Sequence, residues 1–212
     1  IIRDRTTGDD DVKTLYDETF QQYLSTRPVN ATLLKLFGAE PQKDVRWSIM
    51  CDAKRVNQKT VTARVRGSEL HLMLAESYAH PGAQQNEAKA LSLLNELRRK
   101  RIEDVEDYTL QSLQSLPEPD PEALITVDAA GKPLTRLISA ILDERRKELY
   151  MEGDRWFELK RNGCPEWWVI QQSGSTLPVK YVTRKYLYTM PVSVRDIRNS
   201  QGQIAQNPGY EF

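Results

Sequence analysis

Two amphipathic segments joined by a short turn constrain the fold of this chain more than any other feature. In the first segment, apolar side chains recur at helical spacing at Leu70, Leu74, Ala75 and Tyr78. After the break at His80-Pro81-Gly82, a second apolar stripe consists of Ala88, Leu91, Leu94 and Leu97. Because a short connection makes consecutive helices lie antiparallel, residues 68–101 are predicted to form a helical hairpin of the tetratricopeptide type.

The other periodic segments predict further helices and a few strands. Apolar residues at helical spacing predict helices at about 10–25 and at 134–152. Alternating apolar residues predict strands at 45–51 and 60–66, which are expected to pair as a small antiparallel ribbon. A further strand is expected within 180–191.

Residues 103–133 are rich in proline and acidic side chains, and they predict a long irregular loop with one helical turn. The expected fold class is therefore mainly α, with tetratricopeptide-like helical hairpins, long irregular loops and a small antiparallel β ribbon. We expect residues 1–212 to form a single domain.

A dense block of charge at residues 142–163 contains three glutamates on one predicted helix face. Glu144, Glu148 and Glu152 are spaced four residues apart, and acids at this spacing repel one another unless cations lie opposite. Candidate cations flank the glutamates or follow the break at Gly153, and they are Arg145, Lys147, Arg155, Lys160 and Arg161. We interpret the block as a lattice of ion pairs that fixes a helix corner, with Trp156 and Phe157 packed into the core beneath it.

The same glutamates allow an alternative interpretation as a glycoside hydrolase. Hydrolysis requires two carboxyl groups about 5–10 Å apart across an open cleft, and neighbours at this helical spacing can meet that distance. However, basic neighbours tend to lower carboxyl pKa values, whereas a general acid needs a raised one. Hydrolysis by Glu144, Glu148 or Glu152 therefore remains the enzyme alternative.

Three aromatic residues are candidate contacts for a ligand. Trp167 and Trp168 follow a proline between two predicted elements, where they either pack inward or lie exposed and stack on sugar rings. Tyr181 is the third candidate. We expect these three side chains to contribute to ligand binding.

Charge and residue usage exclude several functional classes. Thirty Lys and Arg residues balance thirty Asp and Glu residues, so no net field attracts a nucleic acid. Apolar runs are only a few residues long, far short of the roughly 20 that span a bilayer. Two cysteines and two histidines predict neither a disulfide framework nor a metal site, and no cofactor is expected.

Four stretches of the sequence resemble motifs of the SusD/RagB family. "RVRGSELHLMLAESYA" matches a family helix at Arg66, Glu69, Ala75 and Glu76, and "NELRRKR" resembles the end of the next helix. "YLYTMPVSVRDIRNSQGQIAQNPGY" is similar to the closing motif of the family, with Thr189-Met190 in place of Pro-Ile. The most recognisable block is "ERRKELYMEGDRWFELKRNG", which matches at Glu144, Arg145, Glu148, Leu149, Glu152, Gly153, Arg155, Trp156, Phe157, Leu159 and Arg161.

The resemblance is strongest over residues 60–212 and corresponds to the C-terminal half of family members. It implies a non-enzymatic lipoprotein on the surface of the outer membrane, which captures oligosaccharides or peptides for a SusC-like TonB-dependent transporter. The chain has no lipid-anchor motif, so we expect it to be a piece of a longer protein whose anchor lies outside this sequence. The alternative binding function is a helical-repeat module that holds a protein or peptide, through the 68–101 hairpin or the acidic 103–133 loop.

Overall fold

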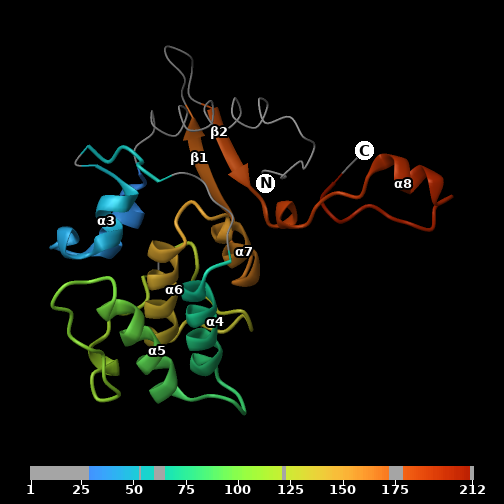
Figure 1. The fold of residues 1–212 in the computed structure, drawn as a ribbon. Coiled ribbons are helices and arrows are strands. Elements are labelled where there is room, and N and C mark those ends of the chain that lie inside the picture. The colour runs from blue at the N-terminus through green and yellow to red at the C-terminus, as the bar shows by residue number, and fades with distance from the viewer. Residues whose placement is uncertain (1–28, 53, 60–64, 121–122, 172–178, 211–212) are drawn as a thin grey trace. The chain divides into compact units, whose positions relative to one another are not determined.

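The computed structural model describes residues 29–52, 54–59, 65–120, 123–171 and 179–210 (Figure 1). The chain divides into two compact units. The first unit comprises residues 1–119 and 134–156, and the second comprises residues 120–133 and 157–212. The expected single domain stays a prediction, and the helix expected at about 10–25 lies outside the described residues.

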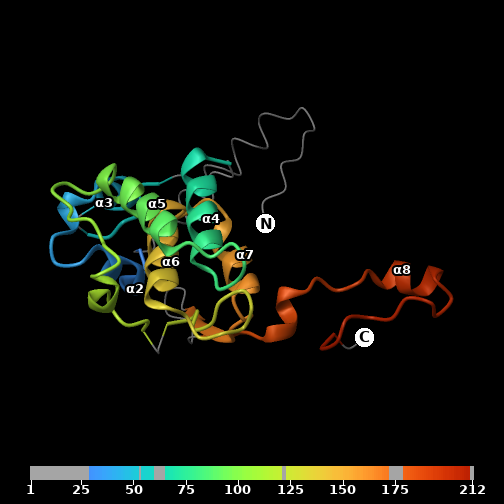
Figure 2. The same ribbon diagram turned by 90° about the horizontal axis from the view of Figure 1, so that it is seen from below.

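Three helices form the body of the first unit. The helices α4 (Gly67–Ala79) and α5 (Glu87–Arg99) make the predicted hairpin, and α6 (Arg136–Glu148) packs beside both (Figures 1 and 2). Each of the later two helices begins at a capping side chain, because Asn86 accepts the backbone N–H of Lys89 and Thr135 accepts that of Ile138. The predicted hairpin is therefore confirmed, and the predicted long helix is confirmed over Arg136–Glu148 but ends before Glu152.

The buried face of α4 differs from the predicted stripe. Leu72, Ala75 and Ala79 are almost fully buried, whereas Leu70 is 56% exposed and Leu74 is also exposed. Small residues on the inner face let α4 approach its partners closely. With that face turned inward, Leu70 and Leu74 point away from the core. On α5 the predicted stripe is largely correct, because the core receives Ala90, Leu91, Leu94 and Leu97.

The predicted strand at 45–51 is wrong, since α3 (Val45–Met50) is a helix. Asp44 caps this helix by accepting the backbone N–H of Arg46, and it also binds the guanidinium of Arg46. The helix then turns Met50 into the core and leaves Val45 exposed. A local cap and the burial of Arg46 therefore outweigh the β propensity of the alternating apolar residues. The partner strand expected at 60–66 lies mostly outside the described residues.

Short helical turns precede α3 and form a second core cluster with it. They are α2 (Ala31–Leu34), η1 (Lys35–Phe37) and η2 (Pro41–Lys43). Buried Leu33 of α2 and Phe37 of η1 pack with Met50 of α3, whereas η2 contributes no buried residue. The ring of Trp47 contacts that of Phe37 edge-on with centroids 5.4 Å apart. In the described part of 103–133, the regular element is η3 (Leu113–Ser115), so the long irregular loop with one turn is confirmed.

The second unit contains the antiparallel ribbon, at a different place from the one predicted. The helix α7 (Asp154–Arg161) starts in the first unit, and β1 (Trp167–Gln171) then pairs with β2 (Val179–Thr183). The chain continues through η4 (Lys185–Tyr188) to α8 (Val194–Asn199). The strand predicted within 180–191 is thus confirmed only at its start. The mainly α fold with a small antiparallel ribbon is confirmed.

Membrane-spanning geometry is absent from the described helices. None of them combines the length and the apolar character that a bilayer crossing requires.

The corrected face of α4 leads to a prediction about stability. Replacing buried Leu72 with alanine should lower the free energy of unfolding by about 3 kcal/mol, because it leaves a cavity between the helices. Replacing exposed Leu70 with alanine, the matched control, should change it by less than about 0.5 kcal/mol. Urea denaturation followed by circular dichroism measures both, and equal losses would contradict this orientation of α4.

Candidate functional site

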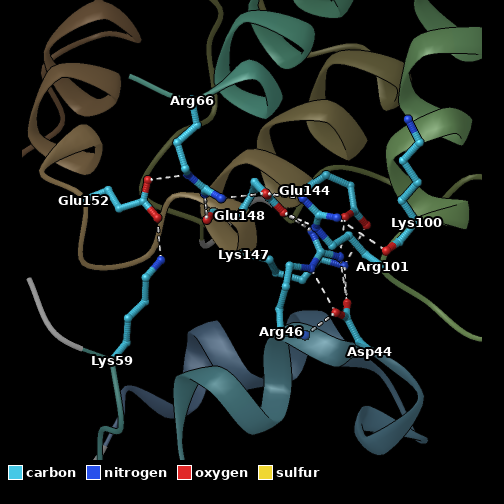
Figure 3. Close-up of polar contacts among 10 residues, drawn as sticks. All are labelled: Asp44, Arg46, Lys59, Arg66, Lys100, Arg101, Glu144, Lys147, Glu148 and Glu152. Atoms are coloured by element: carbon cyan, nitrogen blue, oxygen red, sulfur yellow. Dashed lines mark hydrogen bonds and ion pairs between the residues drawn. The ribbon is translucent and has the colours of Figure 1, made fainter. Parts of the chain in front are cut away.

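The three glutamates of the charged block meet a group of cations at one end of α6 (Figure 3). Glu144 and Glu148 lie on the last turns of α6, and Glu152 follows in the turn beyond it. We call these glutamates and the cations that bind them the carboxylate corner. The described cations of this corner are Arg46, Lys59, Arg66, Arg101 and Lys147.

Glu148 is the centre of the corner. Its carboxylate accepts hydrogen bonds from Arg101 at 2.9 and 3.0 Å and from Arg66 at 3.2 Å, and Arg46 lies 3.5 Å away. Arg66 also donates to the backbone carbonyl of Glu148 at 2.6 Å and to Glu152 at 2.8 Å. One arginine therefore binds the C-terminal end of α6 and the turn that follows it.

Glu144 is held by two cations, one of which, Arg46, also lies near Glu148. Arg46 donates to one of its oxygens at 2.7 Å, and Lys147 donates to the other at 2.6 Å. Asp44 binds the same Arg46 at 2.6 Å, so this guanidinium bridges α3 to α6. All four side chains are buried, which is favourable only because each charge has partners.

The cations keep these carboxyl groups ionised. Burial opposes the ionisation of Glu148, but hydrogen bonds from Arg101 and the charges of Arg101 and Arg46 outweigh it and lower its pKa to about 2. Burial also opposes the ionisation of Glu144, and the charges of Lys147 and Arg46 reverse that effect, so its pKa is lowered as well. A general acid in a glycosidase needs a raised pKa, so the geometry of the corner is suited to fixing the fold.

For the remaining residues of the charged block, the structure agrees with only some of the predicted positions. Arg145 is buried and makes a two-pronged ion pair with Asp154, at 2.5 and 3.0 Å, which connects α6 to α7. Gly153 joins the two helices in a left-handed conformation, with φ of 81°, which disfavours other residues. Arg155 and Trp156 are partly buried. Phe157 is 62% exposed, so the prediction that it packs into the core is wrong.

The three candidate ligand contacts lie on the ribbon, and the strand register separates them. Trp167 pairs with Thr183, Trp168 with Val182, and Val169 with Tyr181. Because successive side chains of a strand point to opposite faces, Trp167 and Tyr181 share one face while Trp168 lies on the other. A single sugar ring therefore cannot stack on both tryptophans.

The two faces of the ribbon differ in their surroundings. Trp167 is partly buried and donates its indole N–H to the hydroxyl of Tyr188 at 3.2 Å, which anchors the start of β1. Trp168 is 56% exposed, and the ammonium of Lys180 lies 4.8 Å from the centre of its ring. Tyr181 is also exposed. Trp168 and Tyr181 thus offer open aromatic surface, and Trp167 has mainly a structural position.

Sequence reasoning missed the residues that reach these sites from distant segments. The sequence pattern places Arg46 in a predicted strand and indicates no role for Lys59, Arg101 or Lys180. The alternation of β2 and its pairing with β1 would have placed Lys180 beside Trp168. Among the described residues, no group of three or more His, Cys, Asp or Glu side chains has the arrangement needed to hold a metal ion.

The carboxylate corner predicts how stability depends on pH. The folded-state pKa of Glu148 is lowered to about 2, so folded Glu148 holds fewer protons than unfolded Glu148 as the pH falls below about 5. Its contribution to stability is present above that pH and is lost toward pH 2. Glu148→Gln should therefore cost about 3 kcal/mol at neutral pH and lose less stability than the wild type between about pH 6 and pH 3.

The matched control for this prediction is Glu103→Gln, because Glu103 is an exposed glutamate on the loop after α5. Urea denaturation across the pH range measures the free energy of unfolding of all three proteins. Glu103→Gln should follow the wild type throughout. A parallel pH profile for Glu148→Gln and the wild type would show that Glu148 is not the group responsible.

Comparison with known proteins assigns the chain to a family. Neither the curated proteins nor the solved structures gave a significant match. The sequence model of the SusD family matches residues 50–210, which include α4, α5, the carboxylate glutamates and the ribbon. This match covers most of the chain and agrees with the motifs that the sequence carries, so the chain belongs to the SusD family.

Proposed function

We propose that this chain is a non-enzymatic component of an outer-membrane uptake complex and that it captures oligosaccharides. The single observation that carries the proposal is the exposed indole of Trp168, with the ammonium of Lys180 over its ring. Membership of the SusD family, a family of nutrient-binding proteins, supports the same function.

Capture by this face combines two interactions. An aromatic ring offers a flat apolar surface to the C–H face of a sugar, and a neighbouring ammonium donates hydrogen bonds to its hydroxyl groups. Tyr181, opposite Val169 on the second face of the ribbon, offers a further aromatic contact. An extended glycan reaches both faces only by passing around the edge of the ribbon, so we assign the main contact to Trp168.

Binding without hydrolysis agrees with the state of the glutamates. Glu144 and Glu148 are enclosed by cations and have lowered pKa values, so neither is suited to donate a proton to a glycosidic oxygen. The proposed partner is a SusC-like TonB-dependent transporter, and the proposed location is the outer-membrane surface, as a lipoprotein. Chemical crosslinking in native cell envelopes, followed by mass spectrometry, tests the partner.

Calorimetric titration against a panel of oligosaccharides tests the proposed binding. Trp168→Ala should weaken the binding of any glycan that the wild type binds by about 1 kcal/mol, or roughly fivefold, because the stacking surface is lost. The matched control is Phe157→Ala, which removes an exposed aromatic ring that is not on the ribbon and should leave the affinity unchanged.

Other outcomes support the alternatives. Saturable binding of a peptide with failure of every glycan would favour the peptide-binding module. Release of reducing sugar by the wild type, abolished in Glu144→Gln, would favour the hydrolase. Equal affinities of wild type and Trp168→Ala would remove Trp168 as the main contact.

A further inference from the structure

The second unit contains a pocket that none of the preceding assignments uses. Its volume is about 610 Å3, which is within the range of small-molecule sites. The lining comes from the segment before β1, from η4 and from the last described residues of the chain. Its lining includes Glu166, Arg184, Lys185, Tyr186, Asn207 and Gly209.

One wall of this pocket is fixed by the closing "QNPGY" sequence. The side-chain amide of Gln206 accepts the backbone N–H of Val192 at 2.8 Å and donates to its carbonyl at 2.9 Å. Asn207 donates to the carbonyl of Met190 at 2.6 Å, and the hydroxyl of Tyr210 donates to that of Thr189 at 2.8 Å. These bonds hold the C-terminal segment against residues 189–192.

The ring of Tyr186 forms an aromatic wall with a fixed position. Gly209 has φ of 91°, and a Cβ atom there would lie 2.5 Å from Cγ of Tyr186, so only glycine allows this approach. The ring of Tyr210 packs edge-on against the same ring, with centroids 5.0 Å apart. Tyr186 nevertheless remains 38% exposed, so it keeps surface for a ligand.

The charge of the pocket is positive. Arg184 donates to Glu166 at 3.2 Å, and the backbone N–H of Lys185 donates to the same carboxylate at 3.1 Å. These hydrogen bonds lower the pKa of Glu166, so it stays ionised at neutral pH. Two cations and one carboxylate leave the lining with a net charge of +1. In the described contacts, the ammonium of Lys185 has no carboxylate partner, and Glu166 uses one guanidinium nitrogen of Arg184.

The sequence around the pocket also carries a net positive charge. Residues 164–210 carry two acidic side chains, Glu166 and Asp196, in a chain whose total charge is zero. They carry five basic ones: Lys180, Arg184, Lys185, Arg195 and Arg198. Cationic charge is thus concentrated in the segment that holds the pocket, which favours an anionic ligand.

We propose that this pocket binds a carboxylate-bearing sugar unit of an acidic oligosaccharide, with Lys185 and Arg184 at the carboxylate and Tyr186 against the ring. The proposal rests on the proposed function and narrows its ligand class. Arginine and lysine are the usual partners of carboxylates, and an aromatic wall suits the apolar face of a sugar. Asn207 lies beside them in the lining and supplies an amide oxygen for a sugar hydroxyl.

The test compares two trisaccharides that differ in charge. The full chain is titrated calorimetrically with the trimer of galacturonic acid and with the neutral galactose trimer of the same linkage. The acidic trimer should bind about tenfold more tightly, the difference expected from a charge-assisted hydrogen bond in a partly exposed site. This preference should shrink as salt concentration rises, because the attraction is electrostatic.

Matched variants locate the effect. Lys185→Gln should abolish the preference for the acidic trimer, because it removes the cation assigned to the carboxylate. Arg195→Gln removes an exposed cation of α8 that does not line the pocket, so it should retain the preference. Gly209→Ala should displace Tyr186 and weaken both trimers.

The outcomes separate this proposal from the proposed function. Three results would overturn the pocket proposal alone, provided that neutral glycans still bind through Trp168. They are failure of the acidic trimer to bind, equal binding of both trimers, and a preference that survives in Lys185→Gln. If no glycan of the panel binds, the capture function itself is overturned. Circular dichroism of each variant shows whether the fold is retained, and Lys185→Gln, an exposed substitution, should leave it unchanged.

Discussion

The first unit depends on the ion pairs that three arginines make with the buried carboxylate of Glu148. Three arginines from separate segments reach it, and each brings a different part of the chain to the end of α6. Arg46 belongs to α3, Arg66 precedes α4 and Arg101 follows α5. A buried carboxylate without cations would be strongly unfavourable, so these four groups are stable only together. The register of three helices is therefore coupled to one acidic side chain.

These ion pairs bring together family motifs that lie far apart in sequence. Arg66 and Glu69 at the start of α4 meet the acidic and basic residues of the charged block, through the pairs Arg66–Glu148 and Glu69–Arg145. Arg145 in turn binds Asp154 across the turn at Gly153. The block that first suggests chemistry instead connects helices, and the two surfaces proposed to bind a ligand are on the ribbon and in the pocket of the second unit.

The closing motif has a comparable role in the second unit. The side-chain amides of Gln206 and Asn207 form hydrogen bonds with backbone groups of residues 190–192. Gly209 leaves room for the ring of Tyr186 to pack against the backbone. A short sequence with little regular structure of its own thus fixes an aromatic and cationic pocket. The ribbon supplies its aromatic surface differently, because strand alternation places Trp167 inward and leaves Trp168 exposed. Both surfaces present aromatic rings beside lysines, which agrees with one class of polar, ring-containing ligand.

The sequence by itself determined the elements whose signal is local. Helical periodicity and a short turn specify the α4–α5 hairpin, the i, i+4 glutamates specify a need for cations, and ordered motifs specify the SusD family. Tertiary structure decided what depends on distant partners. Alternating apolar residues at 45–51 predicted a strand, but the contacts of Arg46 with Asp44 and Glu144 favour a helix there. Flanking cations were expected around the glutamates, yet most of the described ones come from other segments. Long-range ion pairs and strand register join residues with no fixed spacing, and for that reason only the folded chain reveals them.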